Sequence, residues 1–386
     1  MHNMEGIIME FPMAQNKTLE KEKTEKEKWR AVYCDSVKFK GYLAPKSWTL
    51  CVGAGISKGI VPDWHNLAHH VVNSAYNLSL NDDEFQKIVS ETGWSLDSWI
   101  QAAANKFQAD GRESADFKSL IESQIYSIIR SKATGMGLSR YLIQVLSDPH
   151  SAPRDRVIEI CDFLENTFSG SSLFQTGRAL IQCEKSGTAP KAVLTFNADT
   201  LLETYINLNL RRTHYLGPGP YGHPEFPFVQ VTRPVIKSGN NIPIIHCHGA
   251  IAPKDTGVHR HRDSRDRLIF LEQEYLDMAS SRASWGESQF LFHAHSTKMV
   301  FLGLSMADSN IRKWMNGINI EKSRDLQLFG YEGIPNPHHV WIKPEPAAPQ
   351  MKQVYLLSLL HLGVRPGWIK SWRDVETALL NLSSAI

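Results

Sequence analysis

The hydrophobic positions of this chain follow a helical period in one long internal region. Between residues 73 and 186, apolar side chains recur every three or four positions. One such face consists of Leu96, Trp99, Ile100, Ala103 and Phe107. This spacing predicts amphipathic helices, each burying one apolar stripe. We therefore expect residues 73–186 to be mostly helical.

On both sides of this region the pattern changes to short apolar runs rich in β-branched residues, which predict buried strands. The runs lie at the start of residues 48–57 and at 191–195, 226–232, 243–247, 268–271, 298–303 and 339–343. Helical patterns follow several of them, and strands alternating with helices indicate a parallel sheet covered on both faces. The predicted fold is a doubly wound, Rossmann-like α/β domain interrupted by a helical insert.

This pattern also divides the chain into predicted domains. Residues 31–72 and 187–386 form the α/β domain, and residues 73–186 form the insert. Residues 1–30 form an N-terminal arm, in which the stretch 17–30 is almost entirely charged and mixed in sign. A solvated helical arm and an assembly contact both remain open for it.

Composition narrows the class of protein. The 386 residues are 42% hydrophobic and 21% charged, which excludes collagen, coiled coil and low-complexity disorder for most of the chain. A net charge of +2 gives no electrostatic case for binding nucleic acid or membrane. No apolar run approaches the roughly 18 residues that span a bilayer, and we expect a cytoplasmic protein. The five cysteines have no C-x-x-C spacing, which argues against disulfide scaffolds and zinc ribbons.

Polar and glycine residues gather where four predicted strands end. The segments are G-A-G-I-S (53–57), T-F-N-A-D (195–199), H-G (248–249) and G-L-S (303–305). Open α/β sheets bind ligands at the carboxyl ends of their strands, so we expect these groups to converge. Glycines at a strand-to-helix turn let backbone amides approach a phosphate. The full dehydrogenase pattern G-x-G-x-x-G is absent, which disfavours an ordinary dehydrogenase.

These segments together resemble the SIR2 superfamily, the sirtuin-like fold that consumes NAD. G-A-G-I-S followed by G-I-V-P-D-W (59–64) is similar to the family's first motif, with one extra residue before the proline. T-F-N-A-D resembles its T-Q-N-x-D segment, H-G its catalytic His-Gly, and G-L-S its G-T-S. The resemblance covers roughly residues 48–72 and 187–370.

Two departures distinguish the chain from sirtuin deacetylases. Residues 250–298 contain no cysteine, although the deacetylases carry a four-cysteine zinc module there, and Phe196 replaces their glutamine. The chain instead resembles prokaryotic SIR2-like NAD glycohydrolases of antiphage defence. That resemblance implies cleavage of NAD to nicotinamide and ADP-ribose, an oligomer, and a separate infection-sensing partner such as a HerA-like ATPase.

The resemblance also implies roles for individual residues. His248 would accept a proton from water or a ribose hydroxyl, Asn197 would orient the ribose or the water, and Asp199 would bind the carboxamide or stabilise positive charge. No metal is expected. The residues expected to bind NAD are Gly53, Ala54, Gly55, Ser57, Asp63, Gly303 and Ser305.

Other functions stay open at this point. An NAD-dependent protein deacylase and a non-catalytic sensor of NAD or ADP-ribose derivatives both fit the resemblance. His246 and His248 lie two apart on a strand, so a metal site with His259 or His261 is conceivable. Ser305 follows a strand and precedes a helix, which partly resembles the nucleophile turn of an α/β-hydrolase.

Overall fold

The computed structural model describes residues 42–150, 152–217, 226–232, 241–253, 268–280, 284–330 and 338–383. The predicted N-terminal arm lies outside these residues. So do His259, His261 and the charged stretch at 260–267.

A seven-stranded parallel sheet forms the centre of the described chain, in the order β3-β4-β2-β1-β5-β6-β7. The predicted α/β fold class is therefore confirmed. The strands are β1 (Trp48–Val52), β2 (Ala192–Thr195), β3 (Phe228–Val231), β4 (Ile242–His246), β5 (Lys298–Leu302), β6 (His339–Pro344) and β7 (Val364–Ile369).

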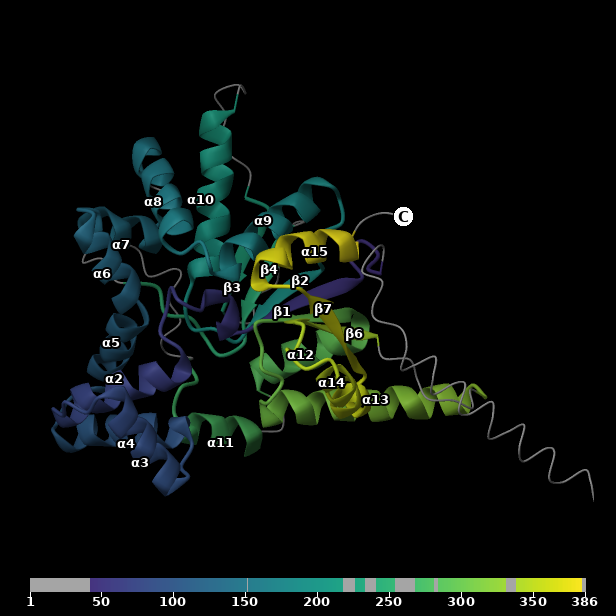
Figure 1. The fold of residues 1–386 in the computed structure, drawn as a ribbon, viewed down its shortest axis with the longest axis horizontal. Coiled ribbons are helices and arrows are strands. Elements are labelled where there is room, and N and C mark those ends of the chain that lie inside the picture. The colour runs from purple at the N-terminus through teal and green to yellow at the C-terminus, as the bar shows by residue number, and fades with distance from the viewer. Residues whose placement is uncertain are drawn as a thin grey trace, which may run out of the picture.

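Helices cover both faces of this sheet, because alternate residues of each buried strand point to opposite sides. On β5, Val300 and Leu302 join the core on one face, and Met299 and Phe301 join the core on the other. The first face is covered by α9 (Ser172–Lys185), α10 (Leu201–Leu216) and α15 (Val375–Ser383). The second is covered by α12 (Trp285–Ser296), α13 (Ser309–Leu328) and α14 (Met351–Leu359) (Figure 1).

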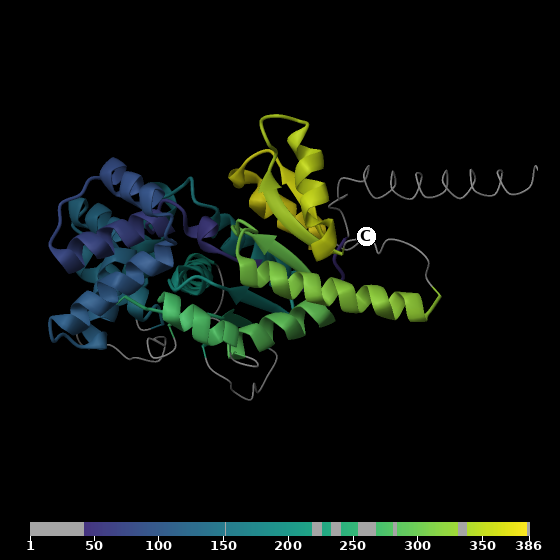
Figure 2. The same cartoon turned by 90° about the horizontal axis from the view of Figure 1, so that it is seen from below.

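Most of the predicted helical region forms a lobe beside the sheet, at the left of Figures 1 and 2. Its helices share one apolar core, whereas α9 packs on the sheet. None of the described helices is long and apolar enough to cross a membrane. The lobe contains α2 (Trp64–Tyr76), α3 (Asp82–Thr92), α4 (Leu96–Ala109), α5 (Ser114–Ile125), α6 (Ser127–Gly135), α7 (Ser139–Ser147) and α8 (Arg154–Thr167).

One strand prediction was wrong, and one strand was not predicted. Residues 268–271 form no strand, since the amides of Phe270 and Leu271 donate to the Glu274 carboxylate at the start of α11 (Glu272–Ser280) rather than to a neighbouring strand. Conversely, β7 was missed because Pro366 and Gly367 interrupt its apolar pattern. A proline is tolerated there because β7 is an edge strand.

The α-helix expected directly after the glycines of residues 53–57 begins later than predicted. Only the 3-10 helix η1 (Ala54–Ser57) forms there, and the α-helix begins later, at Trp64. Two further 3-10 helices are η4 (Leu360–Leu362) and η5 (Trp372–Asp374).

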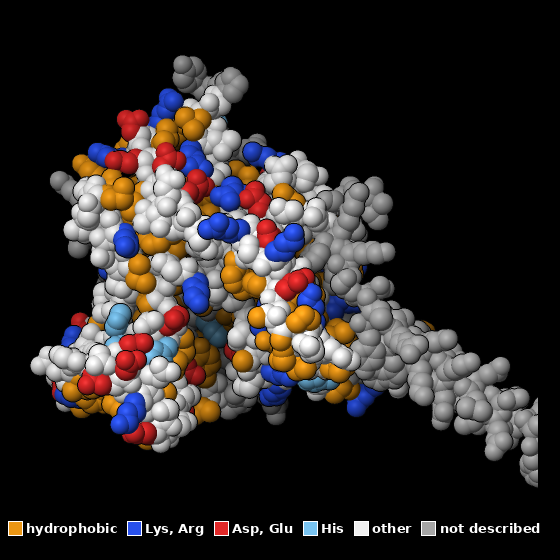
Figure 3. All heavy atoms as spheres, viewed as in Figure 1, with side chains coloured by type: hydrophobic (Ala, Val, Ile, Leu, Met, Phe, Trp, Pro, Cys, Tyr) orange, Lys and Arg blue, Asp and Glu red, His pale blue; other side chains and the backbone are white. Residues whose placement is uncertain are grey.

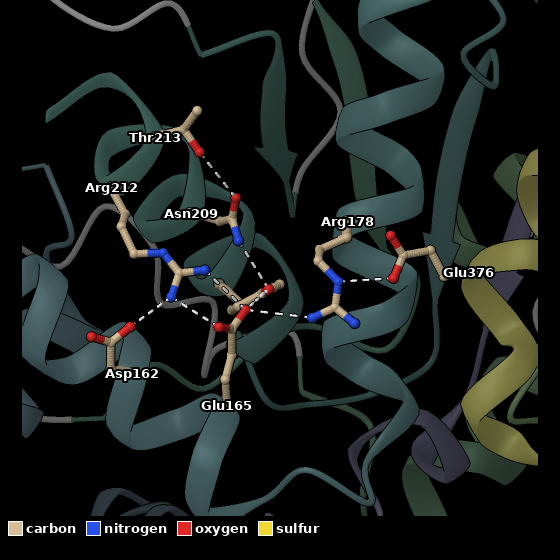
Figure 4. A network of polar contacts seen from close by, with 8 residues as sticks. Asp162, Glu165, Arg178, Asn209, Arg212, Thr213 and Glu376 are labelled. Carbon is tan, nitrogen blue, oxygen red and sulfur yellow. Dashed lines mark hydrogen bonds and ion pairs between the residues drawn. The ribbon is translucent and has the colours of Figure 1, made fainter. Parts of the chain in front are cut away.

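A network of charges fastens the lobe to the helices of the sheet (Figure 4). Glu165 of α8 accepts hydrogen bonds from Arg212 of α10 and from Arg178 of α9. Arg178 also donates from Nε to Glu376 of α15, at 2.8 Å. Burial alone would raise the pKa of Glu165, but its bonds to Arg212 and Tyr205 hold that pKa below the ordinary value. The network therefore stays charged at neutral pH.

Candidate active site

Four loops that follow parallel strands meet at one edge of the sheet. They begin at Gly53 after β1, Phe196 after β2, Cys247 after β4 and Gly303 after β5. These loops, the lobe and α11 enclose a cleft of about 940 Å³. Figure 3 shows it as a hollow between the lobe and the sheet domain, with histidine and hydrophobic side chains in its wall. The sheet thus brings together the segments that the sequence singled out.

Asn197 stands in the wall of this cleft with almost all of its polar atoms engaged. Its backbone N–H donates to Thr195 Oγ1 at 3.1 Å, and its carbonyl faces His246 Nδ1 at 3.2 Å. Its side-chain Nδ2 donates to Ser57 Oγ at 3.4 Å. Only the buried Oδ1 has no partner. An orphaned buried acceptor of this kind is the atom that a ligand hydroxyl or a water satisfies.

Asp199 is the second buried polar group of this loop, and it orders Ser57. Its Oδ2 accepts from the Ser57 hydroxyl at 3.3 Å, and its Oδ1 accepts from Leu201 N at 3.0 Å. Because Ser57 donates to Asp199, its oxygen can only accept from Asn197, which fixes the amide with Nδ2 toward Ser57. Burial raises the pKa of Asp199 to about 6, despite the opposing hydrogen bond from Leu201.

His248 lies between two aromatic rings. Phe196 and Tyr275 contact it edge to face, with centroids at 4.9 Å and 5.4 Å. Among the described residues no side chain hydrogen-bonds to its imidazole. Burial lowers the pKa of His248 to about 4, and the nearby carboxylate of Asp308 offsets this only in part. The side chain is therefore neutral at pH 7 and can accept a proton, but it is a weaker base than an ordinary histidine.

Two amides of the glycine turn, which the sequence places where a phosphate could bind, donate to backbone carbonyls instead. Gly53 N donates to Leu302 O at 3.0 Å, and Gly55 N donates to Gly303 O at 2.9 Å. A Cβ on Gly55 would lie 2.7 Å from the Gly303 oxygen. Gly303 itself has a φ of +68°, and a Cβ there would lie 2.6 Å from Ile56 N. These glycines are thus required by the close packing of two loops.

The other residues expected to bind NAD occupy different places. Ala54, Gly303 and Ser305 line the cleft together with Gly53 and Gly55. Ser57 is fully buried beneath it and holds Asp199, as described above. Asp63 is exposed, does not line the cleft, and caps α2 by accepting from Asn66 N at 2.9 Å.

The structure adds cleft residues that the motifs did not indicate. Tyr275 lies in α11, four residues after the predicted strand at 268–271. Asp97 comes from α4 of the lobe, and its indole partner Trp64 donates to it at 3.1 Å. Asp308, the N-cap of α13, completes this group. Trp64 and Asp97 lie 33 positions apart in the chain, so no local pattern could have assigned Asp97 to the cleft.

Two of the alternative chemistries find no support here. His246 pairs with Glu203 at 2.8 Å, and within the described ranges no group of three metal-ligating side chains occurs. The Ser305 oxygen accepts from Ala307 N at 3.2 Å, a local turn bond, rather than contacting a histidine base.

A comparison with known protein families matches part of the chain that lines this cleft. Residues 191–360 match the family model described as the SIR2-like domain. This part of the chain is a SIR2-like domain. The match includes Asn197, His248 and Ser305, whereas the glycine turn after β1 precedes it. No curated protein matches the chain.

A SIR2-like domain indicates an NAD-utilising enzyme, and the cleft suits that ligand. Its volume lies at the upper end of the roughly 300–1,000 Å³ typical of small-molecule sites. The free Oδ1 of Asn197 can accept from a ribose hydroxyl, and the neutral imidazole of His248 lies in the same wall. The donors and acceptors present therefore fit a nucleotide sugar.

Proposed function

We propose that this protein is an NAD glycohydrolase that releases nicotinamide and ADP-ribose. The observation that carries the proposal is Asn197, whose side chain is anchored through Nδ2 while its buried Oδ1 has no partner, in the wall of the cleft that also holds His248. An amide fixed in this way presents one acceptor in one direction. That is the arrangement needed to orient a ribose hydroxyl or an attacking water.

The chemistry follows from the charge that develops when the glycosidic bond breaks. Nicotinamide leaves with the bonding electron pair, positive charge spreads over the ribose, and water adds at the same carbon and loses a proton. His248, neutral and surrounded by aromatic rings, accepts a hydrogen bond from that water or from a ribose hydroxyl. Above pH 6 Asp199 is ionised, and its carboxylate favours the cationic transition state.

Water is the proposed acceptor because the chain has no zinc module for an acetyl-lysine substrate. Residues 250–298 contain no cysteine, so a four-cysteine site between the His-Gly and Gly-x-Ser segments is excluded by composition. NAD turnover should therefore need no acetylated peptide. Zinc chelators should not slow it.

The decisive experiment measures nicotinamide release from NAD by the purified full chain. His248→Ala should lower kcat roughly 10²–10⁴-fold, the usual worth of general acid–base help. His293→Ala is the matched control, because His293 is also buried and burial lowers its pKa to about 4, but it contacts Thr49 away from the cleft. It should retain most of the activity.

Three outcomes would contradict the proposal. Near-full turnover by His248→Ala would remove the assigned base. Nicotinamide release only in the presence of an acetylated peptide would favour the deacylase. Tight binding of NAD without any turnover would favour a sensor.

We further propose that this activity serves antiphage defence and is controlled by assembly. An uncontrolled NAD hydrolase would exhaust its host, so turnover should depend on a homo-oligomer or on a sensing partner, for which a HerA-like ATPase is the candidate. Light scattering and nicotinamide release, with and without the product of the neighbouring gene, test this together. A stable and fully active monomer would contradict it.

A further inference from the structure

A pair of buried charged side chains, Glu203 and His246, lies directly behind Asn197. His246 ends β4 and is fully buried, and Glu203 lies in the first turn of α10. His246 Nε2 is 2.8 Å from Glu203 Oε1, and Nδ1 is 3.2 Å from the carbonyl oxygen of Asn197. Neither side chain lines the cleft.

The partners of His246 define its protonation. A carboxylate and a backbone carbonyl are both acceptors, so each ring nitrogen has to carry a proton to bond them. Burial alone would lower the pKa of His246, but Glu203 and the Asn197 carbonyl raise it above the ordinary value. These contacts favour an imidazolium that donates on both sides, with its charge balanced by Glu203.

The contacts of Asn197 show where this imidazolium acts. The backbone of Asn197 is held at N–H by Thr195 and at the carbonyl by His246, while Ser57 holds Nδ2. Of these three bonds, the carbonyl bond is the one that comes from the neighbouring strand β4. It therefore fixes the peptide that follows Asn197 and, through it, the direction of the side chain.

We propose that His246 and Glu203 form a positioning pair that holds the Asn197 carbonyl and so aims its Oδ1 at the reacting ribose. The inference rests on the proposed function and assigns residues to the same site. Neither residue touches the substrate. Partners of this kind, one step removed from the reacting groups, typically change activity by about 10–100-fold.

The test uses two amides that each replace one nitrogen of the histidine. In His246→Asn the amide nitrogen stands close to the position of Nδ1 and can still donate to the Asn197 carbonyl. In His246→Gln the amide nitrogen stands near Nε2 and can reach only residue 203. Both are made in a Glu203→Gln background, so that no buried carboxylate is left without a cation.

The positioning role predicts a split between these matched variants. The protein with His246→Gln should lose about 10–100-fold in kcat with little change in KM, whereas the protein with His246→Asn should stay within a few-fold of Glu203→Gln alone. Thermal midpoints measured in parallel show whether the two are destabilised alike. Equal loss of kcat in both, or loss that follows stability alone, would overturn the inference.

A second readout needs no substrate and so separates this inference from the proposed function. In protein labelled with ¹⁵N at asparagine, the side-chain signals of Asn197 are assigned by their loss in Asn197→Ala. They should stay sharp and single in the His246→Asn variant and broaden or split in the His246→Gln variant. Unchanged signals in both would overturn the positioning role, while absence of NAD cleavage by the wild-type chain would contradict the proposed function alone.

Discussion

At the scale of single residues, the cleft depends on a short chain of hydrogen bonds that starts at a carboxylate. Asp199 accepts from Ser57, and Ser57 in turn accepts from Asn197. When Asp199 is ionised it can only accept, which fixes the direction of both bonds. When it is protonated it can donate to Ser57, and the order of the Asn197 amide is lost.

This chain makes the activity depend on pH through Asp199. We expect kcat/KM for NAD to rise as pH increases through about 6, the raised pKa of Asp199, and then to level off. Charged and titratable groups around it are Glu203, His246 and Tyr126. The low pKa of His248, about 4, adds no further change above pH 5.

Replacing Asp199 by asparagine should remove this rise and lower the plateau. Asp308→Asn is the control, since asparagine also caps helices well and the rise near pH 6 should survive there. Initial rates of nicotinamide release between pH 5 and 8 measure both. A rise near pH 6 that persists in Asp199→Asn would assign the titration to another group.

The raised pKa of Asp199 also makes the stability of the fold depend on pH. The folded-state pKa of Asp199 lies above its ordinary value of 3.8, so the folded chain binds more protons between about pH 4 and 6. This contribution stabilises the fold at low pH and is lost as pH rises through 6. The thermal midpoint of Asp199→Asn should therefore gain on the wild type as pH rises from 4 to 7.

At the scale of elements, the loops after β1 and β5 act as one packed unit. The Gly55 amide bonds the Gly303 oxygen, and the two backbones approach too closely for a side chain on either. From sequence, a glycine-rich turn of this kind predicts a ligand-binding loop. Here the glycines first allow the two loops to pack against each other, and the packed loops together line the cleft.

Gly55→Ala should therefore destabilise the fold, because its Cβ would lie 2.7 Å from a backbone oxygen that cannot move freely. The expected loss in the free energy of unfolding is about 1–3 kcal/mol, as for other overpacked sites. Gly317→Ala is the control: Gly317 lies within α13 with open space at its Cβ, and alanine should be neutral or stabilising by up to about 1 kcal/mol. Denaturant unfolding compares them, and equal stability of Gly55→Ala and the wild type would contradict the packing argument.

At the scale of the whole molecule, Tyr126 connects the helical lobe to the loops that follow β2 and β4. It lies between α5 and α6 and is fully buried. Its hydroxyl donates to Ile251 O at 2.7 Å and accepts from Thr200 N at 3.2 Å. Thr200 directly follows Asp199, and Ile251 lies three residues after His248. Movement of the lobe would therefore be transmitted to both loops through the side chain of Tyr126.

Tyr126→Phe should cost about 1–3 kcal/mol in the free energy of unfolding, because it leaves a buried amide and a buried carbonyl without this partner. It should also lower NAD turnover by loosening the Asp199 loop. Tyr76→Phe, which removes an exposed hydroxyl bonded to Ala102 O, should stay within about 0.5 kcal/mol of the wild type. If both variants behave alike, the lobe is not coupled to the site through Tyr126.

Much of the element pattern could be predicted from sequence because burial acts locally on it. The strands around Val193, Ile244 and Val300 are buried on both faces, and such strands appear as short apolar runs. The run at Leu268 and Phe270 misled, since its side chains are buried in the core of the lobe rather than in the sheet. The hydrophobic run correctly predicted that these side chains are buried. It did not show that they pack against the lobe.

The sequence by itself determined the class of the fold and which segments carry the site, because parallel strands place their carboxyl ends at one edge. The tertiary structure alone decided what those residues can do. It lowered the pKa of His248 through burial, raised that of Asp199, and occupied the amides of Gly53 and Gly55 with backbone partners. Each of these depends on atoms brought from distant parts of the chain, and no local pattern records the dielectric or the partner that results from folding.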